Sequence, residues 1–586
     1  MYTLKAPSFL RPSSRPSSPA PTQQTQVVSA DRTAKPSMLS FSTFKRSSEA
    51  VSKALTQPPG PPLPTELVNG RRPIPAGRGT TLGNLIASEI KASRENPYLY
   101  RAVLRTLHRP LSVLVNNLSA NLLPLLSSPD FSSPVTPSQH LWQPNATQLH
   151  ALGYANLAGE LLDTFDLVGL GLESDMRGDG LKVVRDGLVS VVKRVVDPLV
   201  TGIKKDLMPH IEALEFNNST SSSPYGSPAK TPGATKLAQL QQHASIIYLQ
   251  GSMPAYARAL SRFITTPTAE SSLATLLISL VWRGLVALSS RPFPPASPPT
   301  SPALLPPSLS RGATKDAKKS SMSLNGSHAH VAGTPITPPT TPPASRFTLK
   351  LPPPSRPVSP NGGSLGVASA SADARALYDL LLMLPRPKGE GENSKRQLAK
   401  EVVDEAFEAL AALPALLQTA QSAYYLGGHG QVQRGRPGYG GVPVPVREGE
   451  MENDLDVLTA DVPTLIALPI ILRAYVWHHL PPILPLPLST SSNSNAPQGP
   501  GPATIPERTV SSMLGLSEAA YRNGCLSGFG REEECTAAVG QRVLDVLKQE
   551  LRNAKVDWMT PEGTAKEVGV VLRWLEKQVA VAEVHH

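Results

Sequence analysis

Cysteine, aromatic residues and charged residues are all scarce in this chain of 586 residues. Its two cysteines, Cys525 and Cys535, cannot build a disulfide framework for a chain of this size, and we expect an intracellular, reducing compartment. Aromatic residues account for 5% of the chain, and charged residues account for 17% against a usual share of about 25%. The apolar share of 40% nevertheless excludes a chain that is disordered throughout.

Long uninterrupted apolar runs are also missing from the sequence. Residues 1–20 contain four prolines and no continuous apolar segment, so we expect no secretory signal there. The most apolar stretches, residues 273–288 and 458–488, are interrupted by charged residues or prolines before they reach about 18 residues. These stretches predict buried helices or a hairpin rather than membrane spans.

Proline, in contrast, is abundant: 62 of the 586 residues are proline, roughly twice the usual share of about 5%. The prolines gather with serine in segments that cannot bury enough apolar surface to offset the entropy of the chain. Between them, apolar residues recur at steps of three and four, which is typical of helices that bury one face. The clearest such pattern covers residues 181–216, where Pro198 predicts a kink or a split.

Because convincing strand patterns are missing, we predict an all-α fold. The expected architecture is a helical bundle-like core, in one or two subdomains, interrupted by long disordered Pro/Ser-rich segments. Its predicted regions are a disordered basic tail (1–79), a helical region with short disordered loops (80–290), a Pro-rich linker (291–370), a helical region with a Gly-rich loop at 427–441 (371–488), a second linker (489–506) and a C-terminal helical region (507–586).

No pattern in the sequence specifies a catalytic, cofactor-binding or metal-binding residue. The glycine cluster at residues 77–83 lacks the lysine and the strand–loop–helix frame of a phosphate-binding loop, and it predicts a turn. The two cysteines have no histidine near them and do not match zinc spacing. Three acidic residues precede Cys535, and they oppose formation of a thiolate. We therefore expect no cofactor, and these observations favour a non-catalytic protein over an enzyme.

The formal net charge of +11 favours acidic partners. Residues 181–205 combine a Val/Leu-rich face with six basic residues: Lys182, Arg185, Lys193, Arg194, Lys204 and Lys205. Such a helix lies either on anionic lipid or in a core with a solvated basic face, and the lack of Trp and Phe in it favours the core. Nucleic acid is not an expected partner, because the sequence has no zinc finger, basic zipper or RNP pattern.

The most frequent motif is Ser-Pro or Thr-Pro within the Pro-rich segments. It predicts phosphorylation by a proline-directed kinase at Ser227, Thr231, Ser297, Ser301, Thr334, Thr337, Thr341 and Ser359. A further run, Pro61-Pro62-Leu63-Pro64, resembles a ligand of WW domains, which bind segments that are already extended. A chain rich in serine and proline also produces such motifs by chance, so both readings stay open.

These features favour a non-catalytic intracellular scaffold, adaptor or complex subunit with phosphorylatable proline-rich linkers and protein partners. The first alternative is a peripheral membrane or trafficking factor that binds an anionic membrane surface through residues 181–205. A helical enzyme with an unrecognised site is the less favoured third hypothesis. A cytoplasmic location is expected; the alternatives are the nucleus and, if the basic N-terminal tail is a transit peptide, the mitochondrion.

Overall fold

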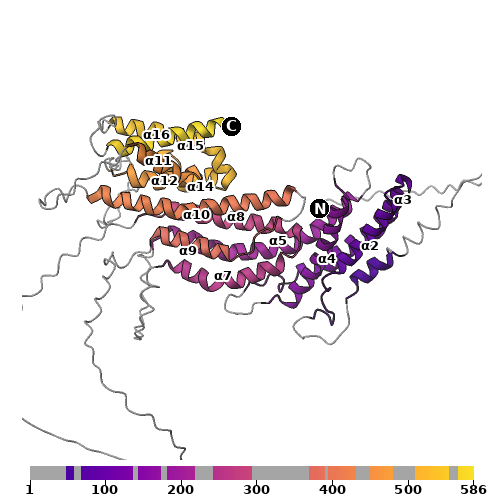
Figure 1. Ribbon diagram of the computed structural model, residues 1–586. Helices are drawn as coiled ribbons and strands as arrows, with labels where there is room; N and C mark the ends of the chain where they lie inside the picture. The colour runs from indigo at the N-terminus through magenta and orange to yellow at the C-terminus, as the bar shows by residue number, and fades with distance from the viewer. Residues whose placement is uncertain are drawn as a thin grey trace, which may run out of the picture.

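The computed structural model describes residues 46, 48–57, 67–135, 143–172, 181–217, 242–293, 369–389, 394–429, 448–478, 508–553 and 565–585. Within these ranges the chain is helical and forms no strand beyond an isolated bridge between Val68 and Arg71, so the predicted all-α fold is confirmed. The helices stack into an elongated body (Figure 1).

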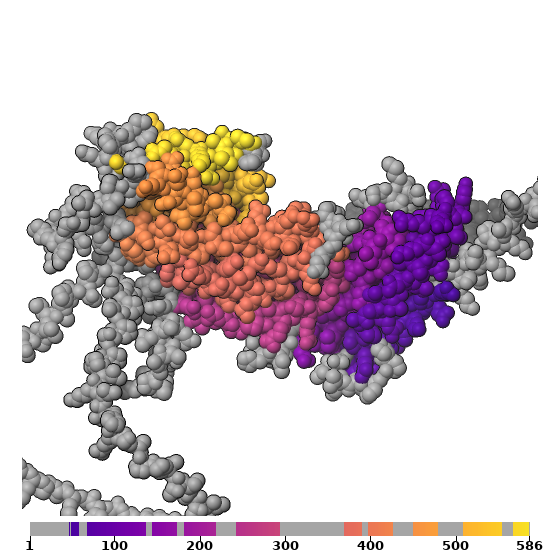
Figure 2. Space-filling view, viewed as in Figure 1, coloured from indigo at the N-terminus to yellow at the C-terminus, as the bar shows by residue number. Residues whose placement is uncertain are grey.

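One end of the body consists of α2 (Arg78–Ser93), α3 (Pro97–Leu126) and α4 (Ala146–Val168). The middle contains α5 (Lys182–Glu212), the short 3-10 helix η2 (Ala213–Glu215), α7 (Ala244–Phe263), α8 (Pro267–Ser290), α9 (Ala370–Leu382) and α10 (Ser394–His429). The other end contains α11 (Glu448–Thr459), α12 (Thr464–Tyr475), α13 (Val510–Met513), α14 (Glu518–Cys525), α15 (Phe529–Asn553) and α16 (Ala565–His585). In Figure 2 these C-terminal helices form a block that rises from one end of the body.

Helix boundaries follow from local capping chemistry. The side chain of Asn96 accepts hydrogen bonds from the first amides of α3, where Pro97 occupies the first helical position. At the start of α4, Asn145 and Gln148 form a reciprocal capping box. The same helix ends at Gly169, whose φ of 74° is a conformation that glycine adopts without strain.

The helix α8 forms the centre of the fold. It packs against α5 on one side and α10 on another, and it also contacts α4, α9 and α12. By length and composition α8 is long and apolar enough to cross a membrane, but 67% of its most apolar 18-residue window is buried within the fold. Since α8 contacts α9 and α10, the helices before and after residues 294–368 share one core, a question that the sequence left open.

The helix α5 continues through Pro198, so of the two outcomes predicted there, a kink or a split, the split does not occur. Pro198 itself is exposed, whereas Val195, Leu199 and Ile203 around it are buried. Apolar packing of this stripe against α4 and α8 stabilises the helix on both sides of the proline, which outweighs the local loss of a backbone hydrogen bond.

The glycine cluster at residues 77–83 forms a turn and the beginning of α2, as predicted. The carboxylate of Glu160, on α4, accepts hydrogen bonds from the backbone amides of Gly77 at 2.7 Å, Gly79 at 2.8 Å and Thr80 at 3.2 Å. These amides have no intrahelical partner at a helix start, and the helix dipole favours an anion there. An internal carboxylate thus occupies the place that a phosphate would take in a nucleotide-binding loop.

The acidic residue Asp163 gives the fold a measurable pH dependence. It lies on α4 near Glu160 and Asp166, and Arg396 of α10 approaches its carboxylate to 3.6 Å. Burial, opposed by Arg396 and reinforced by neighbouring acids that include Glu270, raises the pKa of Asp163 from 3.8 to about 6. The folded chain therefore holds this proton more tightly than the unfolded chain. The resulting stabilisation is fully present below about pH 3.8 and is lost as the pH rises through about 6.

We expect Asp163→Asn to remove this loss. The melting temperature of the variant minus that of the wild type should rise between about pH 4.5 and about pH 7.5, as the wild-type carboxyl ionises. Thermal unfolding of both proteins over this range measures the difference. Asp456→Asn, which changes an exposed ion pair with Lys577, is the matched control. A difference that stays constant with pH would contradict the raised pKa of Asp163.

Candidate functional site

A buried polar cluster lies where several chain segments begin and end. We call it the anchor cluster, and it consists of Asn217, His243, Arg291, Asp373 and Arg473. At its centre the guanidinium of Arg291 contacts the carboxylate of Asp373 at 2.5 Å, and each side chain is 1% exposed. The Nε of Arg291 also donates to the side-chain oxygen of Asn217 at 2.9 Å. Arg291 thereby joins the end of α8 to the end of η2 and to the first turn of α9.

His243 connects α7 to the same cluster in its neutral form. Its Nδ1 accepts a hydrogen bond from the amide of Ser245 at the start of α7, so its proton lies on Nε2 and is donated to the carbonyl of Phe216. Burial, followed by the nearby Arg291 charge, lowers the pKa of His243. Its own amide donates to Asp373 at 3.2 Å. Both ring nitrogens are therefore used to hold chain segments together.

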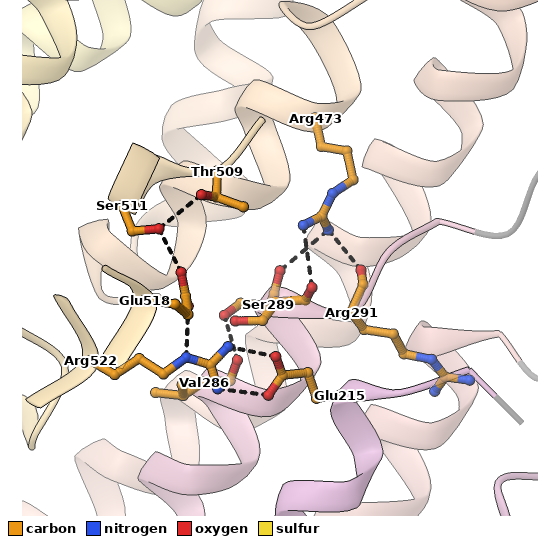
Figure 3. Close-up of polar contacts among 10 residues, drawn as sticks. Glu215, Val286, Ser289, Arg291, Arg473, Thr509, Ser511, Glu518 and Arg522 are labelled. Atoms are coloured by element: carbon orange, nitrogen blue, oxygen red, sulfur yellow. Dashed lines mark hydrogen bonds and ion pairs between the residues drawn. The ribbon is translucent and has the colours of Figure 1, made fainter. Parts of the chain in front are cut away.

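Arg473, on α12, caps the C-terminal end of α8 (Figure 3). Its guanidinium donates to the carbonyls of Ser289 at 3.4 Å, Ser290 at 3.4 Å and Arg291 at 2.7 Å. The last carbonyls of a helix have no intrahelical partner and carry partial negative charge, so a cation is favourable at this position. Arg473 thus fixes α12 to the end of α8.

The anchor cluster gathers the ends of two long connections that lie outside the described residues. Asn217 directly precedes residues 218–241, and His243 lies just after them. Arg291 lies just before residues 294–368, and Asp373 lies just after them. Both connections therefore begin and end at one buried cluster. The entropy cost of closing such loops grows only with the logarithm of their length.

A second polar network lies beside the anchor cluster (Figure 3). Arg522 of α14 makes two hydrogen bonds to Glu215, at 2.7 and 2.5 Å, and its Nε donates to Glu518 at 2.7 Å. The hydroxyl of Ser511 donates to the other oxygen of Glu518 at 2.6 Å. Burial alone would raise the pKa of Glu518, but the hydrogen bonds from Ser511 and Arg522 outweigh burial and lower it. Arg522 therefore links α14 to η2 through charge-assisted hydrogen bonds.

A cavity of about 520 Å³ opens between these two networks. Its volume lies within the roughly 300–1,000 Å³ of sites that bury a drug-sized ligand. The charged side chains on its walls are two acids and two arginines: Glu215, Glu518, Arg473 and Arg522. Its apolar walls include Phe216, Leu465, Pro469, Trp477, Tyr521 and Leu526. The cavity is thus largely apolar and carries no net charge.

Two further groups of side chains in the described residues bear on metal binding and on thiol chemistry. Among the described residues, no group of three or more His, Cys, Asp or Glu side chains is arranged to hold a metal ion. The two free thiols, Cys525 and Cys535, are half-buried next to each other, and burial together with the hydrogen bond to Cys535 raises the pKa of Cys525 to about 11. Cys525 is therefore protonated near neutral pH and is a poor nucleophile.

The six basic residues singled out in the sequence all lie on α5. The apolar face of this helix is buried in the core, where Val184, Leu188 and Val195 are at most 2% exposed. Arg185 pairs with Asp166, and Lys204 donates to the hydroxyl of Ser279 at 3.0 Å. The other four are exposed: Lys182, Lys193, Arg194 and Lys205. In this fold α5 therefore offers a partner its basic face and not its apolar face.

The other predicted sites lie outside the described residues. Ser227 and Thr231 fall in residues 218–241; Ser297, Ser301, Thr334, Thr337, Thr341 and Ser359 fall in residues 294–368; Pro61, Pro62, Leu63 and Pro64 fall in residues 58–66. The structure describes only the residues from which these segments depart. Sequence reasoning missed the anchor cluster. Its one local signal is that Arg291 comes three residues after the end of the apolar stretch 273–288.

No known protein family, curated protein or solved structure matches this chain.

Proposed function

We propose that this chain is a non-catalytic scaffold or adaptor whose helical core presents several proline- and serine-rich segments from one location. The supporting observation is the position of the segment ends. Residues 218–241 and 294–368 both begin and end at the anchor cluster. Residues 479–507 begin next to Trp477 and end next to Thr509, which both line the adjacent cavity.

The ends of three segments that carry short motifs therefore lie near one another. Two partners bound to different segments would experience a raised effective concentration, set by the lengths of the segments that carry them. Phosphorylation at a Ser-Pro or Thr-Pro motif would add about −1.5 to −2 charges near pH 7 and change which partner binds. The core supplies rigidity and the segments supply the binding motifs.

The two alternatives from the sequence have less support. In the cavity, Glu215 and Glu518 are bound by Arg522, and Glu518 also accepts from Ser511, so both carboxylates serve to hold the fold together. Membrane binding through α5 would rest on its four exposed cations alone, because its apolar face packs in the core.

Excision of the segments tests the proposal. Residues 218–241 are replaced by a short Gly/Ser linker, and residues 294–368 are shortened to about one eighth of their length. Because Phe216 and His243 are already 3.0 Å apart at a hydrogen bond, we expect the core to fold normally. Shortening residues 294–368 to one eighth of their length lowers the entropic cost of closing this loop by about 2 kcal/mol. The shortened chain should therefore unfold at a slightly higher denaturant concentration than the wild type.

The functional readout is a native pull-down of the tagged chain from its own cells, with stoichiometry measured by mass spectrometry. We expect the full chain to retain near-stoichiometric partners that the excised chain loses. Deletion of residues 1–45 is the control, because it removes a segment that does not begin or end at the anchor cluster. Partners that the folded, excised chain retains in full would contradict display from these segments.

A further inference from the structure

The cavity beside the anchor cluster has the character of a site for an uncharged, extended peptide. Phe216, Trp477 and Tyr521 place aromatic rings on its walls. The carboxylates of Glu215 and Glu518 are already bound by Arg522. An occupant therefore gains apolar and aromatic contact without having to supply charge.

Two polar atoms of the cavity-lining side chains point to the chemistry of the occupant. The ring nitrogen Nε1 of Trp477 and the hydroxyl of Tyr521 are buried and have no hydrogen-bond partner among the described residues. Tyr521 is 4% exposed, and burial raises the pKa of its hydroxyl, which keeps its proton. Since buried donors are nearly always satisfied in native proteins, these two call for an acceptor such as a backbone carbonyl.

The chain carries a matching segment at the rim of this cavity. The connection that starts after Trp477 and His478 returns at Arg508 and Thr509, so both of its ends lie against the cavity. Within it, residues 480–488 read L-P-P-I-L-P-L-P-L, with four prolines and no charged residue. The backbone carbonyls of a polyproline II helix make no hydrogen bonds within the helix, so they are available as acceptors. Four residues in this conformation are about 12 Å long. This short segment is therefore uncharged and provides both hydrogen-bond acceptors and apolar side chains.

We propose that the cavity is an intramolecular receptor for residues 480–488, bound in an extended polyproline-type conformation with backbone carbonyls accepting from Trp477 and Tyr521. Aromatic walls bind proline-rich segments at a low entropy cost, because the polyproline II conformation is already extended. The tether gives the segment an effective concentration of roughly millimolar, so that even a weak site is filled by its own chain. The proposal goes beyond the scaffold function, because it requires no external partner.

The test uses the full chain and a variant in which residues 480–488 are replaced by Gly/Ser of equal length. A fluorescein-labelled peptide of residues 479–489 is the probe, and fluorescence anisotropy measures its binding. We expect the peptide to bind the variant at least about tenfold more tightly than the wild type, whose own segment competes. Trp477→Phe in the variant should weaken binding about three- to tenfold, because the aromatic ring remains but its N–H is lost. A peptide with all four prolines changed to serine should not bind.

Hydrogen exchange gives a second readout that does not depend on the peptide. Residues of α14, which carries Tyr521, should exchange faster in the replaced variant than in the wild type, while α5 should not change. A variant that melts like the wild type but binds no peptide would overturn the proposal. Equal affinity for variant and wild type would also overturn it, since the cavity would then be open to segments of other chains. An unaltered affinity after Trp477→Phe would overturn the assigned donor.

Discussion

Replacing Asp373 with alanine should lower the free energy of unfolding by about 3–5 kcal/mol. The substitution leaves the guanidinium of Arg291 buried at 1% exposure with its carboxylate removed. Arg291 keeps its hydrogen bond to Asn217, but that neutral oxygen does not balance a buried positive charge. Denaturant unfolding followed by circular dichroism measures the loss.

The double variant Arg291→Met with Asp373→Leu should recover much of this stability. Replacing both members of a buried pair by apolar side chains of similar volume is often close to neutral, whereas breaking the pair is not. Lys577→Ala, which removes an exposed ion pair with Asp456, is the matched control and should change stability by less than about 1 kcal/mol. If Asp373→Ala costs no more than this control, the anchor cluster does not hold the core together.

The second large effect is expected at Trp574, which is 1% exposed between the C-terminal helices. Trp574→Ala should cost about 3–5 kcal/mol, because the deleted ring leaves a cavity that the surrounding helices fill only in part. The substitution also removes the hydrogen bond from the indole nitrogen to the hydroxyl of Thr459 at 3.1 Å, which ties α16 to the end of α11. Urea titration of the full chain measures the change.

Trp574→Phe separates the two contributions. It keeps most of the apolar ring and removes the hydrogen bond, so its cost should be nearer to 1–2 kcal/mol. Hydrogen exchange of the alanine variant should show lost protection in α11, α15 and α16, with α2 to α4 unaffected. Equal losses for the alanine and phenylalanine variants would show that the hydrogen bond, and not the packing of the ring, dominates.

The sequence was sufficient to predict elements that depend on local periodicity. The apolar stripe of α5, from Val184 to Ile211, is visible in the sequence because a helix brings every third or fourth residue to one face. The packing of α15 against α16 depends on stripes of the same kind, such as Val543, Leu547 and Leu551 on α15. The absence of a split at Pro198 has a tertiary cause, since the packing of α4 and α8 against α5 is not encoded in the residues around the proline.

The anchor cluster could not be predicted from the sequence, because it too depends on tertiary packing. Arg291 and Asp373 are separated by 82 residues of sequence, and nothing near either one specifies the other. The capping of Gly79 by Glu160 spans 81 residues. The sequence contains many acidic residues and arginines, and the packing of the helices determines which of them form buried pairs. Composition could place the Pro-rich segments, but it could not show that their ends meet.

The central place of α8 has a consequence for synthesis on the ribosome. This helix is complete at Ser290, but α10, which covers one of its faces, ends at His429. At about 5–20 residues per second, the intervening sequence takes about 7–30 s to emerge. During that interval the face of α8 that α10 covers stays open on the nascent chain, although this helix is long and apolar enough to cross a membrane. We expect the growing chain to depend on chaperones until α10 arrives.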